Sequence, residues 1–167
     1  GYAESFETAW QWHAAHWGGP SCLVDSAIYV FSSEGSGSWT ISPDVNAYNP
    51  VTGGWKDFSP MPVATTGGSM GVIGDKIYLV GGWKNQTPNR WVTVNTVMEY
   101  DPGPDSWKQM KAAPVKMGSA ISCVKDSLFY LFGGLEQSSE EGGYITRTSQ
   151  AWTYDPVREI WDSTSLP

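Results

Sequence analysis

The sequence predicts an all-β chain made of short strands, and its composition and periodicity both point to that class. The 167 residues include 19 glycines, 11 prolines and 10 tryptophans, a composition typical of many short strands separated by turns. No long segment repeats its apolar residues every 3.6 positions, as an amphipathic helix would. Because 40% of the residues are hydrophobic and only 16% are charged, we expect the chain to fold rather than remain disordered.

The charge and hydropathy of the chain argue against two classes of partner. The formal net charge is −7, and lysine and arginine do not cluster anywhere in the sequence. The chain therefore offers no basic surface for a phosphate backbone. No apolar run approaches the roughly 20 residues that a membrane-spanning helix requires. We expect neither nucleic acid nor a membrane as a partner.

A pattern of small and aromatic residues recurs three times along the chain. Each copy contains an apolar strand closed by a pair of small residues, as in "DKIYLVGGW" and "DSLFYLFGGL". A tyrosine then opens a proline-containing turn, as in "YNPVTGGW", and a tryptophan follows seven residues later. The small pairs are Gly81 and Gly82, Gly133 and Gly134, and Ser32 and Ser33; the tyrosines are Tyr48, Tyr100 and Tyr154; the tryptophans are Trp55, Trp107 and Trp161.

This recurrence divides the chain into three units, residues 14–62, 63–114 and 115–167. In each unit the second strand is apolar on both faces, which suits a strand buried between two sheets. Short turns join neighbouring strands, so each unit is expected to be a four-stranded antiparallel meander. Residues 1–13 form an N-terminal segment, which is either an irregular terminus or the outer strand of a neighbouring unit, because Phe6 falls at the repeated tryptophan position.

The glycine pair, the Tyr-x-Pro turn and the tryptophan seven residues on together resemble the kelch repeat, a β-propeller blade of about 50 residues. The resemblance covers residues 14–167 and implies three kelch blades. In that family the glycine pair lets the neighbouring blade approach closely, and the tryptophan packs between blades. The first unit departs from the pattern at Ser32 and Ser33, where we expect a distorted end of its second strand.

Three blades do not close a ring, because propellers typically use about 4 to 8 blades. Either two copies of the chain form a homodimer that completes a six-bladed ring, or the remaining blades belong to a longer kelch chain. We favour the homodimer, because uncovered blade faces would promote aggregation.

The candidate binding residues are expected on one face of the propeller. In a meander, the long connections after the second strands share a face with the connections between blades. Aromatic and basic side chains on such connections usually recognise a partner, although each tryptophan could instead fold back over the strand ends. The candidates are Trp39, Trp83, Arg90, Trp91, Tyr144 and Arg147 in the long connections, and His16, Trp17 and Lys116 in the connections between blades.

No catalytic constellation accompanies these residues. His13 and His16 form an HxxH pair without a third convergent ligand, so we expect no metal and no other cofactor. The triplet that begins at Asn85 is a glycosylation acceptor, which would matter only after secretion. Cys22 and Cys123 align with a glycine on the innermost strand and are expected to be buried free thiols. Free thiols favour a cytoplasmic location over a secreted one.

The function implied by the resemblance is a non-catalytic kelch scaffold that binds a protein or peptide partner. The first alternative is a secreted carbohydrate-binding protein that uses its loop tryptophans. A more remote alternative is part of a galactose-oxidase-like copper enzyme, which would need tyrosine and histidine ligands and a thioether-linked tyrosine. Kelch adaptors for acidic partners commonly carry an arginine after Met-Pro, whereas "MPVATT" and "APVKMG" offer only Lys116.

Overall fold

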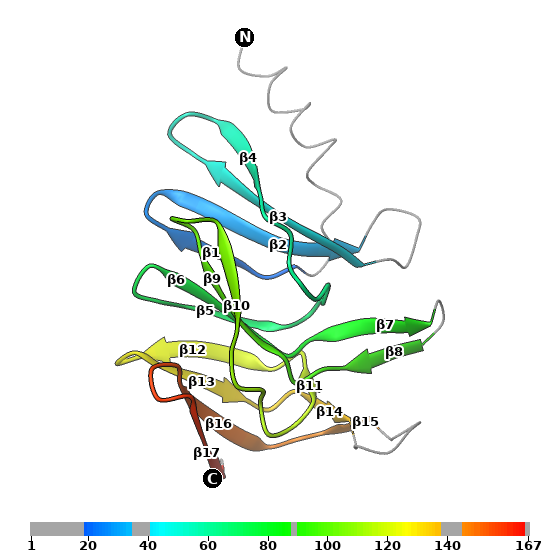
Figure 1. Ribbon diagram of the computed structural model, residues 1–167. Coiled ribbons are helices and arrows are strands. Elements are labelled where there is room, and N and C mark those ends of the chain that lie inside the picture. The colour runs from blue at the N-terminus through cyan, green and yellow to red at the C-terminus, as the bar shows by residue number, and fades with distance from the viewer. Residues whose placement is uncertain (1–18, 35–40, 88–89, 138–144, 166–167) are drawn as a thin grey trace.

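The computed structural model describes residues 19–34, 41–87, 90–137 and 145–165. All the regular elements in these ranges are β-strands, and they form three four-stranded antiparallel sheets and two smaller ones. Figure 1 shows the three large sheets following one another along the molecule. Within the same ranges no helix has the length and hydropathy needed to cross a membrane.

Each large sheet is one blade and lies inside one of the three expected units. Blade 1 contains β1 (Ser21–Val24), β2 (Ala27–Glu34), β3 (Ile41–Asn49) and β4 (Gly54–Phe58). Blade 2 contains β5 (Ser69–Ile73), β6 (Lys76–Val80), β9 (Val97–Asp101) and β10 (Ser106–Gln109). Blade 3 contains β12 (Ile121–Lys125), β13 (Leu128–Phe132), β16 (Gln150–Asp155) and β17 (Ile160–Ser165). The four strands pair in chain order within every blade, as expected for a meander.

The residue after each repeated tyrosine explains why a turn forms there. The side-chain Oδ1 atoms of Asn49, Asp101 and Asp155 accept a hydrogen bond from the backbone N–H two residues further on, at 2.9, 3.2 and 2.9 Å. Asparagine and aspartate stabilise turns in this way because the side chain takes the place of a backbone acceptor. The proline that follows presets the backbone for the same turn.

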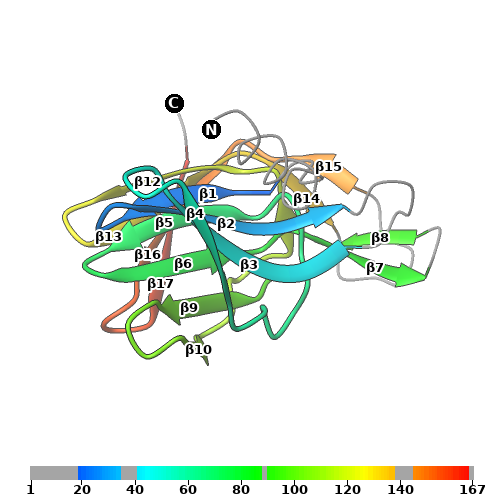
Figure 2. The same cartoon turned by 90° about the horizontal axis from the view of Figure 1, so that it is seen from above.

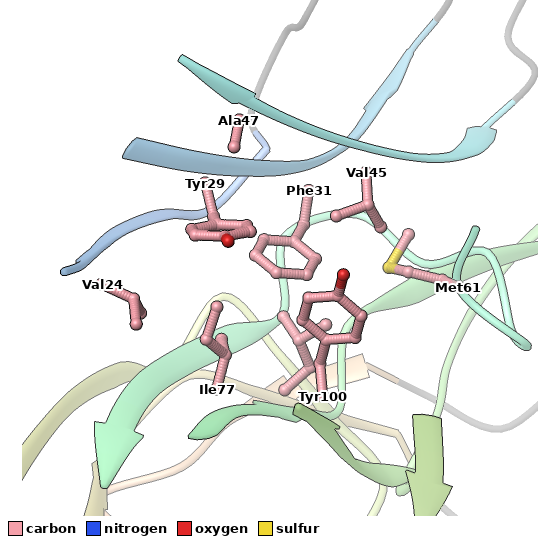
Figure 3. Close-up of a cluster of buried hydrophobic side chains, with 9 residues drawn as sticks. Val24, Tyr29, Phe31, Val45, Ala47, Met61, Ile77 and Tyr100 are labelled. Carbon is pink, nitrogen blue, oxygen red and sulfur yellow. The ribbon is translucent and has the colours of Figure 1, made fainter. Parts of the chain in front are cut away.

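The hydrophobic core lies between the blades (Figure 3). Tyr29 and Phe31 of blade 1 pack against Ile77 and Tyr100 of blade 2, and the Phe31 and Tyr100 ring centroids are 5.9 Å apart. A second cluster joins blades 2 and 3 in the same way and includes Tyr78, Val80, Phe129 and Tyr154. Because each blade buries one face against its neighbour, the stability of a blade depends on the blade beside it.

A group of hydrogen bonds, here called the clasp, joins blade 1 to blade 2 at the outer strands. The Asp105 carboxylate accepts hydrogen bonds from the Tyr100 hydroxyl at 2.7 Å and the Ser59 backbone N–H at 2.9 Å. The Trp107 indole N–H donates to the Ser59 carbonyl at 2.9 Å. The hydrogen bond from Tyr100 is the main reason that the pKa of Asp105 is lowered.

A similar set of hydrogen bonds joins blades 2 and 3, whereas blade 1 lacks the carboxylate that takes part in it. Between blades 2 and 3, Glu159 accepts the Lys111 backbone N–H at 3.1 Å, and the Trp161 indole N–H donates to the Lys111 carbonyl at 3.4 Å. The buried Tyr154 hydroxyl finds no hydrogen-bond partner among the described residues, and burial raises its pKa to about 12. In blade 1 the position of Asp105 is occupied by Gly53, which has no carboxylate to accept a bond.

The repeated glycine pair directly follows the second strand of blades 2 and 3, and in blade 2 it lies against the connection into blade 3. Gly81 and Gly82 have φ values of 67° and 106°, in the region that only glycine adopts readily. A Cβ on Gly81 would overlap the Met117 carbonyl oxygen, which belongs to the connection into blade 3. A Cβ on Gly134 would lie 2.9 Å from the Gly118 carbonyl oxygen, whereas one on Gly133 would lie 3.3 Å from the Thr148 carbonyl oxygen. In blade 1, β2 instead runs on to Glu34, with a register shift between residues 31 and 33.

The two cysteines differ in exposure. Cys22 is half-buried against the core between blades 1 and 2, and burial raises the pKa of its thiol to about 12. Cys123 is exposed, which differs from the expected burial. It occupies the matching position in blade 3, on the face that no other described blade covers, and this accounts for the difference.

Candidate binding face

Two hairpins extend from the same edge of the molecule (Figures 1 and 2). In blade 2 the glycine pair is followed by β7 (Trp83–Thr87) and β8 (Arg90–Thr93), and in blade 3 by β14 (Leu135–Gln137) and β15 (Ile145–Arg147). The short strand β11 (Met117–Gly118) pairs with β14. We call the surface formed by β7, β8, β11, β14 and β15 the hairpin face. It lies opposite the tight β5–β6 and β12–β13 turns.

Backbone hydrogen bonds anchor the first hairpin to both neighbouring connections. Thr66, in the connection into blade 2, exchanges two hydrogen bonds with Trp83, at 2.7 and 2.9 Å. Met117, in the connection into blade 3, donates to the Val94 carbonyl at 3.1 Å and accepts from the Gly82 N–H at 2.8 Å. The base of the hairpin is therefore positioned by the chain on both sides of it.

The Trp83 indole is part of this anchoring. The side chain is half-buried, and its ring lies so close to Gly118 that a Cβ there would overlap the indole. Its indole N–H donates to the Ser119 Oγ atom at 3.2 Å. Trp83 thus packs back onto the connection into blade 3. For this tryptophan the structure favours packing over the strand ends rather than exposure to a partner.

The two hairpins lie side by side and share hydrogen bonds. The Gln137 side-chain oxygen accepts a hydrogen bond from the Thr93 backbone N–H at 2.9 Å. The Gln137 backbone N–H donates to the Lys116 carbonyl at 3.2 Å. Strands β8 and β14 are in direct contact. This contact merges residues from blades 2 and 3 into one surface. The sequence offers no signal for the role of Gln137, because a single amide side chain forms no pattern.

Three of the candidate binding residues on this face are basic. Arg90 is half-buried at the start of β8, whereas Lys116 and Arg147 are exposed. Trp91, beside Arg90, is half-buried and lies opposite Asn85 in the β7–β8 pairing. No ion pair between described residues involves any of the three basic side chains.

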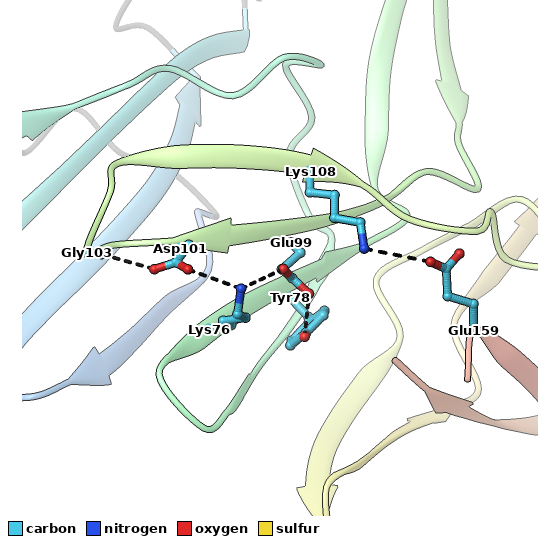
Figure 4. A network of polar contacts seen from close by, with 7 residues as sticks. All are labelled: Lys76, Tyr78, Glu99, Asp101, Gly103, Lys108 and Glu159. Atoms are coloured by element: carbon cyan, nitrogen blue, oxygen red, sulfur yellow. Dashed lines mark hydrogen bonds and ion pairs between the residues drawn. The ribbon is translucent and has the colours of Figure 1, made fainter. Parts of the chain in front are cut away.

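The opposite edge of blade 2 has a different electrostatic arrangement (Figure 4). The Lys76 ammonium lies 3.0 Å from Glu99 and 3.1 Å from Asp101, and the Tyr78 hydroxyl donates to Glu99 at 2.6 Å. Burial acts to raise the pKa of Glu99, but the hydrogen bonds from Tyr78 and Lys76 outweigh it and hold the pKa below its usual range. These charged groups already satisfy one another within the blade.

Four predicted binding residues lie outside the described residues, so their surroundings are not described: His16, Trp17, Trp39 and Tyr144. The HxxH pair lies outside them as well. Among the residues that the structure does describe, no group of three His, Cys, Asp or Glu side chains is placed to hold a metal ion.

Successive four-stranded antiparallel blades, with long connections at one edge and tight turns at the other, define a chain of the β-propeller class. The family model described as Kelch motif matches residues 64–112, which include nearly all of blade 2. The chain belongs to the kelch-repeat family, and its blades are kelch blades.

Individual relatives agree with this assignment. Kelch-like protein terF of Aspergillus terreus is 31% identical over 162 residues, covering 94% of this chain and 34% of its own length. Kelch repeat and BTB domain-containing protein 12 of Homo sapiens is 26% identical over 150 residues, covering 83% and 23%. The solved structure of YjhT superposes with a TM-score of 0.72 at 15% identity, covering 90% of this chain and 51% of that chain. The chain thus spans about a third or less of the length of the two curated relatives, terF and the human protein.

Proposed function

We propose that this chain is a non-catalytic kelch module that binds a protein or peptide partner through the hairpin face. The observation that carries the proposal is the union of the β7–β8 and β14–β15 hairpins, which presents Arg90, Trp91, Lys116 and Arg147 on one face, with no ion pair between the three basic side chains and another described residue. Arginine and aromatic side chains give large contact areas and directional hydrogen bonds, and they dominate the binding energy of many protein interfaces.

Two further features support this face over the opposite one. Its base is held by backbone hydrogen bonds to the blade connections, so little order has to be gained on binding. The opposite edge consists of compact turns, and near it Lys76, Glu99 and Asp101 are already paired with one another within blade 2.

The carbohydrate alternative has weaker support. Sugar binding by stacking requires a tryptophan ring with an open face, and the Trp83 indole is packed against Gly118 with its N–H donated to Ser119. Of the loop tryptophans that the structure describes, Trp91 remains, and one half-buried ring offers a small stacking surface.

A triple variant with a matched control tests the proposal. The immobilised chain is exposed to an extract of its source cells, retained proteins are identified by mass spectrometry, and the affinity of each is measured with the purified protein. We expect Arg90→Ala, Lys116→Ala and Arg147→Ala together to weaken the principal partner at least tenfold, or about 1.4 kcal/mol. The control replaces three basic residues away from this face, Lys111, Lys125 and Arg158, and removes the same charge.

The control separates a specific contact from a general charge effect. Equal weakening by both triple variants would mean that the partner responds only to net charge. Normal binding by the hairpin-face variant, together with loss of binding on changing Asp101 or Asp155, would place the binding site on the opposite face.

A further inference from the structure

The backbone of Thr93 points out of the first hairpin, toward the second one. Thr93 lies opposite Trp83 in the β7–β8 pairing, but Trp83 exchanges both of its backbone hydrogen bonds with Thr66 on its other side. Two residues opposite each other in an antiparallel pair either bond to one another or both turn their backbone groups outward. The N–H of Thr93 therefore faces away from β7, at an edge of β8 with which no described strand pairs.

A side-chain amide of the neighbouring blade occupies this edge. The Gln137 Oε1 atom accepts hydrogen bonds from the Thr93 backbone N–H at 2.9 Å and from the Thr93 hydroxyl at 3.4 Å. The amide oxygen thus takes the place that a carbonyl of an adjacent strand would have. Thr93 is only 2% exposed, so water does not readily replace this acceptor, and a buried N–H without an acceptor is costly.

Gln137 is bonded or paired to all three segments that carry the basic side chains of the hairpin face. Its side chain accepts from β8, the strand that begins at Arg90. Its backbone N–H donates to the carbonyl of Lys116. Across β14 and β15 it pairs with Ile145, two residues before Arg147. The segments that position the three basic residues therefore meet at this one glutamine.

We propose that Gln137 is the positioning residue of the hairpin face, and that it holds the first hairpin against the second so that both act as one recognition unit. The bond crosses from blade 3 to blade 2, where β8 and β14 are in contact without pairing as strands (Figure 1). It fixes the spacing between Arg90 and Arg147 before a partner arrives, and such preorganisation lowers the cost of binding. The proposal rests on the proposed function for the use of this surface, but the position of the hairpins can be measured in the chain alone.

Amide hydrogen exchange at Thr93, followed by NMR, tests the bond in the free chain. Gln137→Met puts a methyl group where the amide oxygen is, and it should speed exchange of the Thr93 amide by about tenfold or more. Gln137→Glu keeps an acceptor oxygen and should stay within about threefold of the parent rate. Gln109→Met, at an exposed glutamine of β10, is the matched control and should leave the rate unchanged.

The separation of the two hairpins tests the positioning. Nitroxide labels on Lys84→Cys and Thr146→Cys, both at exposed positions, report the distance between β7 and β15 by electron resonance. The labelled chain also carries Cys123→Ser, which removes the exposed native thiol. The parent should give one narrow distribution of distances, and Gln137→Met should widen it about twofold because the first hairpin is then free to move. Gln137→Glu should keep the distribution narrow.

Three results would overturn the proposal. The first is Thr93 exchange as slow in Gln137→Met as in the parent, because the amide would then not hold β8. The second is faster exchange with an unchanged distribution of distances, because the bond would then not position the hairpins. The third is a Gln137→Glu variant that behaves like Gln137→Met, because an acceptor would then not be what holds the strand. Failure of the proposed function is a separate result, since normal partner binding by the hairpin-face triple variant would leave both measurements on the free chain unchanged.

Discussion

Replacing Trp107 by alanine should destabilise the chain more than any comparable change at the surface. The indole lies between blades 1 and 2, with its ring centroid 4.7 Å from that of Tyr100 and 6.0 Å from that of Phe31. Full burial of a tryptophan removes about 200 Å² from water and is worth roughly 5 kcal/mol at about 25 cal/mol per Å². Trp107 is half-buried, so about half of that energy applies.

The lost hydrogen bond adds to this cost. The indole N–H donates to the Ser59 carbonyl at 2.9 Å, and leaving such a group unpaired costs roughly 1 kcal/mol or more. We therefore expect Trp107→Ala to lower the free energy of unfolding by about 3 to 4 kcal/mol. Trp107→Phe keeps an aromatic ring but loses the donor, so its cost should be nearer to about 1 to 2 kcal/mol.

Urea denaturation followed by circular dichroism measures both effects. Trp91→Ala is the control, since Trp91 is a half-buried tryptophan on β8 that belongs to neither of the two core clusters. The interpretation of the interface would be refuted if Trp91→Ala cost as much as Trp107→Ala, or if Trp107→Ala cost less than about 1 kcal/mol.

Three other predictions follow from single residues. Because the pKa of Asp105 is lowered, its contribution to stability is present above about pH 4 and is lost as the pH falls through its folded-state pKa. The free energy of unfolding should therefore fall less steeply with decreasing pH in the Asp105→Asn variant than in the parent chain. Gly81→Ala should prevent normal folding because its Cβ has no space, whereas Gly53→Ala, with positive φ but open space, should cost only about 1 kcal/mol in urea denaturation. Iodoacetamide at pH 8 should modify the exposed Cys123 far faster than Cys22, whose thiol pKa is about 12; equal rates would contradict the described exposures.

The blades could be predicted from the sequence because their signals are local and repeated. A tyrosine, a turn former and a tryptophan at constant spacing identify each outer strand pair, and Tyr100 and Trp107 indeed lie opposite each other on β9 and β10. The burial expected for Cys123 was wrong. The alignment of Cys123 with an inner-strand glycine shows where the residue lies within its blade, but the alignment does not show whether another blade covers that position.

The hairpin face was only partly predictable. The order of the strands predicts on which side of the molecule the long connections lie. It does not predict that these connections form hairpins, because their short strands lack an alternation of apolar and polar residues. The pairing in β7 and β8 is supported instead by distant residues, Thr66 and Met117. The packing of Trp83 depends on the small size of Gly118, and such a contact between segments far apart in the chain leaves no periodic signal.

The anchoring of the first hairpin also has a consequence for synthesis of the chain. Residues 83–93 precede Met117, whose backbone holds the base of their hairpin through the Val94 carbonyl and the Gly82 N–H. During translation this segment leaves the ribosome after Thr66 but before Met117, the second of its two anchors, since chains emerge at about 5 to 20 residues per second. We expect the hairpin to acquire slow amide exchange only after the connection into blade 3 has emerged, later than the strands of blade 2 that flank it.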